Sequence, residues 1–345
     1  MNHPSPHEHD RDDHLMNGQL SGGQGESALP LRLGTRRSAL ATAQSGMVAR
    51  EVARVTGRPV ELVEITTYGD TSREALAQIG GTGVFVSALR DALLDGRIDF
   101  AVHSLKDLPT ATPDGLLLAA VPEREDPRDA LVARDGLGLG ELVEKLAGRT
   151  ARIGTGSPRR MAQLNAWASA RGAALETVAI RGNVDTRIGF VHAGELDAVV
   201  LAAAGLNRLG RGAEATEHLD TELMLPAPGQ GALAIECVDA GLAAALAALD
   251  HTPTRTAVVA ERALLATLEA GCSAPVAALA HWAGTELLLE GVVGTVDGAT
   301  LLKMTASGPL VLDETAERQA TALGRALAER LLDGGAAALM GERAL

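Results

Sequence analysis

Strand signals and helix signals alternate along most of this sequence, and this alternation most limits the folds that the chain can adopt. Short apolar runs such as LRLGT (31–35) and IDFAVHS (98–104) are typical of buried strands. Amphipathic stretches such as VFVSALRDALLDG (84–96) lie between them and are typical of helices that end at a glycine. Strands that alternate with helices predict an α/β fold with a mainly parallel sheet.

The strand-helix series begins twice, with similar residues each time. RLGTRRSALATAQ (32–44) and RIGTGSPRRMAQL (152–164) both contain Arg, an aliphatic residue, Gly and Thr, then an arginine pair and a helix. Ser38 and Ser157 are suited to cap the two helices, and Pro158 suits a first helical position. This internal likeness predicts two lobes of similar design that face each other across a central cleft.

The last third of the chain has a different pattern. LPAPGQG (225–231) reads as a hinge before a strand, and 256–271 reads as a helix. Two strand-like runs flank VDG (296–298), and an amphipathic helix follows near the C-terminus. We expect a small α+β domain with an antiparallel sheet.

Charge and cysteine content exclude several classes of protein. The chain of 345 residues has a formal net charge of −13, which argues against a nucleic-acid or anionic-membrane binder. The two cysteines, Cys237 and Cys272, form no disulfide framework and no zinc pattern. The polar tail of about 29 residues has no apolar run of a signal peptide, and its four histidines are expected to be solvated. We expect a soluble cytoplasmic protein without a bound metal.

Seven arginines follow predicted strands, where ligands bind in open α/β sheets. They are Arg36, Arg37, Arg159, Arg160, Arg181, Arg187 and Arg208. A guanidinium matches a carboxylate with two parallel hydrogen bonds, and a helix N-terminus offers free N–H groups to an anion. A surface salt bridge is the ordinary role of any one of them, but their recurrence at one kind of position predicts a polyanion site. A bound anion would also offset the unfavourable cation pair at the helix start of residue 158.

HSLKDLP (103–109) places Lys106 and Asp107 at the end of an apolar strand. Neighbours in a strand point to opposite faces, so both side chains can face one cleft only if the strand ends by about Lys106. A local ion pair is the alternative. A carboxylate among arginines stays ionised and can stabilise a developing cation. Cys272 follows a helix end between small residues, while Cys237 lies in a strand-like run and is expected to be buried filler.

Together these stretches resemble the hydroxymethylbilane synthase family, also called porphobilinogen deaminases. The matching runs occur in family order over roughly 31–280, a far more specific signal than one short motif. They include TTYGDTS (66–72), HSLKDLPT (103–110), REDPRDALV (124–132), IRGNVDTRIG (180–189) and LEAGCSAP (268–275).

The resemblance implies an enzyme that joins four porphobilinogen molecules head to tail, releases ammonia at each step and hydrolyses off linear hydroxymethylbilane. It implies three domains, the first two like the lobes of a periplasmic binding protein. The implied boundaries are a disordered tail over 1–29, domain 1 over 30–124 and 228–249, domain 2 over 125–227 and domain 3 over 250–345. A monomer is implied, with porphobilinogen as its small-molecule substrate.

The resemblance also implies a dipyrromethane cofactor bound through a thioether to Cys272, and it assigns the site residues. Asp107 would lie by the pyrrole N–H groups and stabilise the methylene-pyrrole cation that loss of ammonia leaves, with Lys106 beside it. The cofactor-binding residues would be Arg36, Ser38, Ser104, Lys106, Thr155, Ser157, Arg159, Arg160, Arg181, Gly182, Arg187 and Arg208. Arg37 occupies a position that the family varies. The loop 69–83 would cover the cleft, and Thr82 departs from the lysine that many members have there.

Two rival functions make different predictions. A non-catalytic receptor for a small anion would use the same two lobes and leave Cys272 unmodified. A pyridoxal-phosphate enzyme would use Lys106 as its Schiff base, but the surrounding sequence offers no separate phosphate-binding loop.

Overall fold

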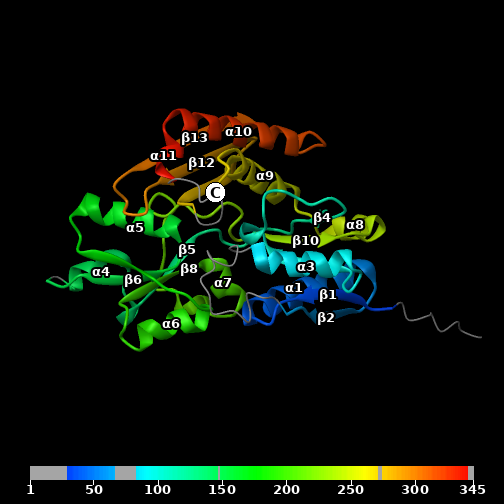
Figure 1. The fold of residues 1–345 in the computed structure, drawn as a ribbon, viewed down its shortest axis with the longest axis horizontal. Helices are drawn as coiled ribbons and strands as arrows, with labels where there is room; N and C mark the ends of the chain where they lie inside the picture. The colour runs from blue at the N-terminus through cyan, green and yellow to red at the C-terminus, as the bar shows by residue number, and fades with distance from the viewer. Residues whose placement is uncertain (1–28, 67–82, 147, 271–273, 341–345) are drawn as a thin grey trace, which may run out of the picture.

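The described residues form three sheets, each packed against its own main hydrophobic core. The computed structural model describes residues 29–66, 83–146, 148–270 and 274–340, with side chains from 86 onward in the second range. Two five-stranded sheets form a left-hand and a right-hand lobe in Figure 1, and a three-stranded sheet lies above them. The predicted class, α/β with two lobes and a small C-terminal α+β domain, is confirmed. Most of the loop 69–83, the N-terminal histidines and Cys272 lie outside the described residues.

The first lobe is built on a sheet in the order β2-β1-β3-β10-β4. Strands β1, β2 and β3 are parallel, and β10 runs antiparallel between β3 and β4, so the chain returns to this sheet late in the sequence. Its strands are β1 (Leu31–Thr35), β2 (Val60–Glu64), β3 (Phe100–Ser104), β4 (Leu117–Ala120) and β10 (Leu233–Cys237). Its helices are α1 (Ala39–Thr56), α3 (Gly83–Leu94) and α8 (Ala240–Leu246).

The second lobe repeats this arrangement with the order β7-β6-β8-β5-β9. Strands β6, β7 and β8 are parallel, and β5 is antiparallel to both β8 and β9. Its strands are β5 (Asp129–Ala133), β6 (Ala151–Thr155), β7 (Leu175–Ala179), β8 (Ala198–Ala202) and β9 (Glu217–His218). Its helices are α4 (Leu139–Lys145), α5 (Pro158–Arg171), α6 (Val184–His192) and α7 (Ala203–Arg208).

The sequence Arg-aliphatic-Gly-Thr that begins each lobe makes the same contacts in both lobes. The backbone N–H of Arg32 donates to Asp99 Oδ2 at 2.7 Å, and that of Arg152 donates to Asp197 Oδ2 at 2.9 Å. Each aspartate lies just before the central parallel strand of its lobe, so the pair joins neighbouring strands where they begin. The arginine of each opening therefore has a structural role at the strand start.

The first strand of each lobe needs a glycine, at Gly34 and at Gly154. The side chain of a residue just before the central strand occupies the space that a Cβ would take there. A Cβ on Gly34 would lie 2.3 Å from Ile98 Cδ1, and a Cβ on Gly154 would lie 2.5 Å from Leu196 Cδ1. No side chain fits at such distances without a shift in the packed core. The shared strand order and these shared contacts support the predicted design of two similar lobes.

The third domain packs a helix pair on an antiparallel sheet. Buried aliphatic residues such as Leu264, Leu289 and Leu327 form its core. Its strands are β11 (Val276–Ala283), β12 (Glu286–Gly294) and β13 (Leu301–Pro309), and its helices are α9 (Thr252–Thr267), α10 (Ala316–Asp333) and α11 (Ala336–Leu339). The predicted hairpin around 296–298 is confirmed, whereas the sequence analysis did not predict β11.

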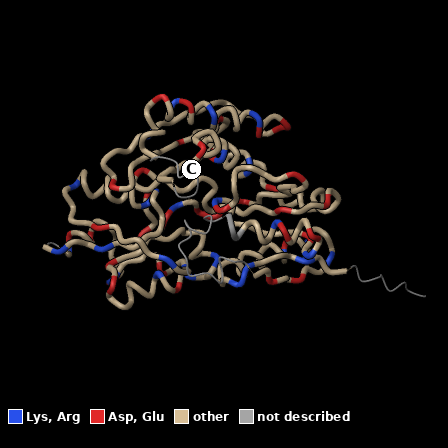
Figure 2. The backbone as a smooth tube through the Cα atoms, in the orientation of Figure 1, with Lys and Arg blue, Asp and Glu red and all other residues tan. Residues whose placement is uncertain are grey.

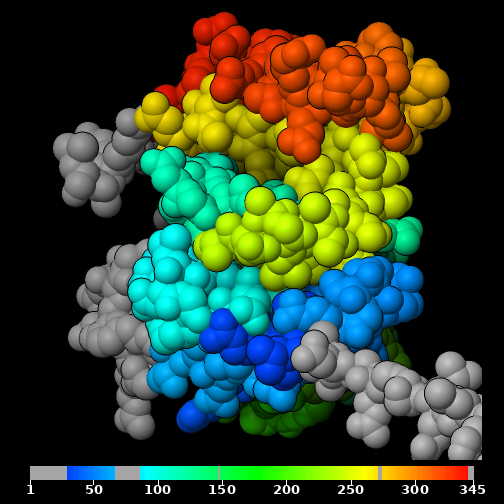
Figure 3. Space-filling view, turned by 90° about the vertical axis from the view of Figure 1, so that its right-hand side faces the viewer, coloured from blue at the N-terminus to red at the C-terminus, as the bar shows by residue number. Residues whose placement is uncertain are grey.

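The third domain contacts both lobes. Figure 3 shows it, coloured orange to red, above the blue and cyan first lobe, with the yellow-green segment that includes α8 between them. Its hairpin tip meets helix α5 of the second lobe: Asn165 Nδ2 donates to the Val296 carbonyl at 2.9 Å. Gly298 is required there, since its φ is +71° and a Cβ would lie 2.3 Å from the Ala166 nitrogen. The helix that carries the arginine pair is thus supported from the third domain.

Among the described residues, no helix combines the length and the apolar character needed to cross a membrane.

Candidate functional site

The segment with Lys106 and Asp107 leaves the sheet directly after β3. The strand ends at Ser104, and Leu105–Asp107 form a single 3-10 turn. The turn is closed by a hydrogen bond from the Leu108 N–H to the Leu105 carbonyl at 3.1 Å, and the Leu105 N–H donates to Ala232 at 3.0 Å. The strand therefore ends before Lys106, which meets the condition for Lys106 and Asp107 to face one cleft. We call Leu105–Pro109 the catalytic turn below, after the role that is predicted for Asp107.

Lys106 of the first lobe is connected to the second lobe through a glutamine. Its Nζ donates to Gln230 Oε1 at 3.4 Å, and Gln230 Nε2 donates to Asp129 Oδ1 at 2.9 Å. Gln230 is buried and lies on the segment by which the chain returns to the first sheet. This glutamine therefore bridges the turn of one lobe and a buried carboxylate of the other.

The arginine pair at the start of α5 lies inside the protein. The expectation that only a bound anion offsets the charge of this pair is therefore wrong. Arg159 and Arg160 are both about 5% exposed or less. Arg159 Nη1 lies 2.8 Å from Asp129 Oδ2, and Arg160 Nη2 donates to Asp129 Oδ1 at 2.7 Å. One buried carboxylate therefore offsets the charge that is unfavourable at a helix N-terminus. Whether the pair also binds a ligand stays a prediction.

Backbone carbonyls complete the surroundings of the pair. Arg159 Nη1 donates to the Leu225 carbonyl at 2.6 Å, and Arg160 Nη1 donates to the Val200 carbonyl at 2.9 Å. The buried Nε of Arg159 has no hydrogen-bond partner among the described residues. A buried N–H without a partner is costly, so this atom is suited to an acceptor such as a ligand carboxylate.

The charges in this cluster shift each other's protonation equilibria. Although burial alone would raise it, the pKa of Asp129 lies well below its usual range because Arg159 and Arg160 surround it. Burial lowers the pKa of Lys106 to about 8, and the nearby Arg160 and Arg159 act in the same direction against Asp107 and Asp129. Three cations thus face two carboxylates, Asp129 and Asp107, and the cluster favours added negative charge.

Two further predicted arginines lie in the same region. Burial, and then the charge of Arg160, lower the pKa of Arg187, so these two guanidinium groups interact. Arg187 Nε donates to the Gly182 carbonyl at 2.9 Å. Arg208 Nη2 donates to the Gly231 carbonyl at 2.6 Å, next to Gln230. The structure therefore brings Arg187 and Arg208 toward the cluster that contains Lys106.

The small predicted residues have local roles. The Ser38 hydroxyl accepts from the Ala41 N–H at 3.3 Å and caps α1, while Ser157 precedes α5 without such a bond. Thr155 is fully buried, and its Oγ1 accepts from the Ser157 N–H at 3.2 Å. The Ser104 hydroxyl accepts from Gln44 Nε2 at 3.1 Å.

Three other predicted positions differ in their surroundings. Arg36 is partly buried directly after β1, whereas Arg37 is exposed and pairs with Glu64 at 2.6 Å, which agrees with its lower expected importance. Gly182 has a φ of +108°, and a Cβ there would meet Thr186 at 2.7 Å, so a glycine is required. Its backbone conformation shapes the loop between Arg181 and Arg187.

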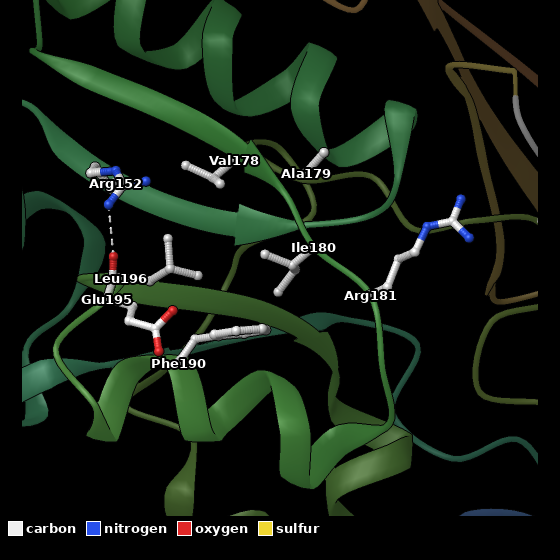
Figure 4. A pocket seen from close by; sticks show the side chains of 8 residues that line it. All are labelled: Arg152, Val178, Ala179, Ile180, Arg181, Phe190, Glu195 and Leu196. Atoms are coloured by element: carbon white, nitrogen blue, oxygen red, sulfur yellow. Dashed lines mark hydrogen bonds between the residues drawn. The ribbon is translucent and has the colours of Figure 1, made fainter. Parts of the chain in front are cut away.

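A pocket of about 550 Å³ opens beside β7 at the edge of the second lobe. Figure 4 shows that its lining is mostly apolar, from Val178, Ile180, Phe190 and Leu196, and that Arg181 points away from these residues. Arg181 is the one predicted site residue in its lining, and neither Lys106 nor Asp107 contributes. This pocket is therefore separate from the Lys106–Asp129 cluster.

The sequence analysis missed Asp129 and Gln230. Asp129 begins an otherwise apolar buried strand, Asp129–Ala133, and a carboxylate in such a strand needs a cationic partner. Glu236 in β10 gives the same signal: it is fully buried, and Arg90 Nη2 donates to its Oε1 at 2.8 Å. Burial alone would raise the pKa of Glu236, but the hydrogen bonds from His103 and Arg90 hold it at about 2.

Figure 2 shows acidic and basic positions interspersed along the chain. Within the part of the chain that the structure describes, no cluster of three or more His, Cys, Asp or Glu side chains could hold a metal ion. Cys237 is buried as predicted, and burial raises the pKa of its thiol to about 11.

The structure is that of an α/β protein with two lobes and a cluster of arginines around Asp129, and comparison with known proteins gives the family. The model "Porphobilinogen deaminase, dipyromethane cofactor binding domain" matches residues 31–244, and "Porphobilinogen deaminase, C-terminal domain" matches 255–333. The chain belongs to the porphobilinogen deaminase family. It is accordingly a transferase of tetrapyrrole biosynthesis, a hydroxymethylbilane synthase of the type that uses a dipyrromethane cofactor.

Curated relatives match along nearly their whole length. "Porphobilinogen deaminase 1" of Streptomyces avermitilis is 68% identical over 320 residues, which cover 91% of this chain and 98% of that protein. "Porphobilinogen deaminase" of Thermobifida fusca is 53% identical over 322 residues, covering 92% and 98%. A solved periplasmic sulfonate-binding protein of Methylobacillus flagellatus covers 71% of this chain with a TM-score of 0.35 and 14% identity, too weak a likeness to support the architecture. The two-lobe description therefore depends on the strand orders.

Replacing Asp129 with Asn should strongly destabilise the protein. The change leaves Arg159 and Arg160 buried without their counter-charge, which costs about 3–5 kcal/mol of unfolding free energy. Urea denaturation followed by circular dichroism measures it. Asp185→Asn is the control, because Asp185 pairs with Arg211 at the exposed surface, where such pairs contribute about 0–1 kcal/mol. Equal losses in the two variants would contradict the central role of Asp129.

Proposed function

We propose that the catalytic turn and the arginines around Asp129 form the active site of this synthase. Asp107 and Lys106 act on the reacting groups. The arginines at positions 36, 159, 160, 181, 187 and 208 bind carboxylates of the cofactor and of the growing chain, with Ser38, Ser104, Thr155, Ser157 and Gly182 shaping or completing that site. The observation that carries the proposal is the cluster of three cations and two carboxylates shared between the lobes.

The residues of the cluster fit a dipyrromethane with carboxylate side chains. The orphaned Nε of Arg159 and the excess of positive charge both favour a bound carboxylate, and Asp107 offers an acceptor for pyrrole N–H groups. Cys272 is proposed as the attachment point on family resemblance, since it lies outside the described residues. When bound, the cofactor supplies the pyrrole carbon to which the first substrate is joined.

Asp107 has the electrostatic role in the reaction. Loss of ammonia from the aminomethyl group of porphobilinogen leaves a cation conjugated with the pyrrole ring. A carboxylate held at the site of that positive charge stabilises the transition state without reorganisation of solvent. Asp107 lies on a short turn that is closed by the hydrogen bond from the Leu108 N–H to the Leu105 carbonyl.

Lys106 and the arginines bind the carboxylates of the substrate and hold them in place. Porphobilinogen carries two carboxylates, so each addition increases the negative charge that the site must hold. Arg159 and Arg160 are oriented before any ligand arrives, because Asp129 and two backbone carbonyls already fix their guanidinium groups. Such preorganisation reduces the entropy lost on binding.

We also propose the domain boundaries, the location, the oligomeric state and the partners that the sequence predicts. The domain boundaries 30–124 with 228–249, 125–227 and 250–345 agree with the membership of the three sheets. We further propose a cytoplasmic monomer that binds porphobilinogen and no nucleic acid, in line with the net charge of −13.

Intact mass spectrometry with peptide mapping tests the proposed function first. We expect added mass equal to two linked pyrrole units on the peptide that contains Cys272, and its loss in Cys272→Ala. Cys237→Ala is the matched control and should keep the adduct, since Cys237 is buried in the first lobe. An unmodified chain that forms no adduct with added porphobilinogen would favour the anion-receptor alternative. Borohydride-reducible absorbance at Lys106 would instead favour the pyridoxal-phosphate alternative.

Asp107→Asn should lower kcat by at least about 100-fold, because the amide cannot stabilise a developing cation as a carboxylate does. Hydroxymethylbilane formation from porphobilinogen is the assay. Asp114→Asn, an exposed position shortly after the same turn, should leave kcat unchanged. Near-normal activity of Asp107→Asn would remove Asp107 from the mechanism.

Binding should weaken as the pH rises through about 8. The pKa of Lys106 is lowered to about 8, so its ammonium loses its proton, and its attraction for carboxylates, above that pH. We expect KM for porphobilinogen to increase about 10-fold between pH 7 and pH 9.5. Lys106→Arg should flatten the profile because a guanidinium stays charged over this range. The same pH dependence in both proteins would assign it to another group.

A further inference from the structure

Arg262 lies against the catalytic turn although it belongs to the third domain. It occupies α9, and the sequence analysis did not single it out. Its guanidinium donates to three backbone carbonyls, those of Leu105 at 3.3 Å, Leu108 at 2.8 Å and Pro109 at 2.7 Å. These acceptors lie on both sides of Lys106 and Asp107 in the chain, so one side chain brackets the two proposed active-site residues.

A guanidinium is suited to this task. It is planar, always charged and carries five donors in a rigid fork, so it can hold several carbonyls in one fixed arrangement. The catalytic turn has few hydrogen bonds of its own: the turn bond from Leu108 to Leu105, and the bond from Leu105 to Ala232. The contacts from Arg262 therefore account for much of what fixes the backbone at Asp107.

The helix that carries Arg262 is itself firmly held. The neighbouring Glu261 is fully buried and accepts from Arg124 Nη1 at 2.6 Å, from the Gly229 N–H at 2.6 Å and from the Ala280 N–H at 2.9 Å. Arg124 and Gly229 belong to the two segments that run between the lobes, and Ala280 belongs to β11. One turn of α9 is thus fixed to the crossing segments through Glu261 and to the catalytic turn through Arg262.

We infer that Arg262 is a positioning residue for the reaction. Its guanidinium donates to the backbone of the catalytic turn, and through that backbone it sets the orientation of the Asp107 carboxylate and the Lys106 ammonium. The third domain thereby contributes to the geometry of the active site in addition to carrying Cys272. This inference rests on the proposed function of Asp107.

The same helix provides a matched control. Arg255 Nε donates to Asp250 Oδ1 at 2.8 Å, and its Nη2 donates to the Leu118 carbonyl at 3.3 Å. Arg255 therefore joins α9 to the first lobe at β4, away from the catalytic turn. Arg255→Met removes a contact of comparable chemistry and tests the effect of weaker domain packing alone.

The experiment compares Arg262→Met, Arg262→Lys and Arg255→Met as full-length, cofactor-loaded enzymes, with loading measured by intact mass. We expect Arg262→Met to lower kcat by about 10- to 100-fold, because small errors of position cost rates of this size. KM should stay within about threefold, since the carboxylate-binding arginines are untouched. Arg262→Lys should restore part of kcat, and Arg255→Met should keep kcat even where Tm falls equally.

Chemical rescue measures whether added guanidinium ion restores kcat, which is not expected if Arg262 only stabilises the fold. Guanidinium ion, added below denaturing concentrations to Arg262→Ala, should raise kcat, whereas it should leave Arg255→Ala unchanged. If Arg262→Met does not fold or load, Arg262→Lys and this rescue decide the question.

The failure of this inference is distinguishable from failure of the proposed function. Full kcat in Arg262→Met, or equal loss of kcat in the Arg262 and Arg255 variants without rescue, would overturn the positioning role while the wild type still makes hydroxymethylbilane. A wild type without adduct and without product would overturn the proposed function itself.

Discussion

The ion pair of Asp129 with Arg159 and Arg160 is the interaction on which the centre of the molecule depends. Three charged groups are removed from water there, and the arrangement is stable because each charge has a partner of opposite sign, while two carbonyls and the Gln230 amide supply further hydrogen bonds. Because Gln230 links the same carboxylate to Lys106, the geometry of the second lobe is transmitted to the catalytic turn of the first.

Two more buried carboxylates organise the surroundings in the same way. Glu236 joins Arg90 and His103 beneath the strand that leads into the catalytic turn, and Glu261 joins the third domain to the segments between the lobes. Burying a carboxylate costs solvation free energy, which hydrogen bonds and ion pairs offset only when the neighbouring groups are correctly placed. These carboxylates therefore fix how the surrounding helices and strands lie relative to one another more closely than apolar packing alone would. The core clusters of each sheet supply the bulk of the stabilisation.

This arrangement explains how an acidic protein can hold a locally cationic cluster. The net charge of −13 belongs to the whole chain, whereas Lys106, Arg159 and Arg160 of the cluster are partly or wholly buried. Local desolvation strengthens their attraction for carboxylates, since the interaction is screened less than it would be in water. Overall charge is therefore a poor guide to the local charge of this cluster, whereas the recurrence of arginines after strands indicated it from the sequence.

The sequence by itself determined the α/β class, the two similar lobes and the family, because these depend on local periodicity and on motifs that are contiguous in the chain. It also identified Asp107 and the arginines as candidates. Only the tertiary structure decided that Arg159 and Arg160 pair with Asp129, that Gln230 bridges the lobes and that Arg262 holds the catalytic turn. Arg262 and Leu105 are separated by 157 positions. Contacts between residues so far apart in the sequence depend on how whole helices and strands pack. The spacing of residues along the chain therefore does not predict which buried charged groups will form a pair.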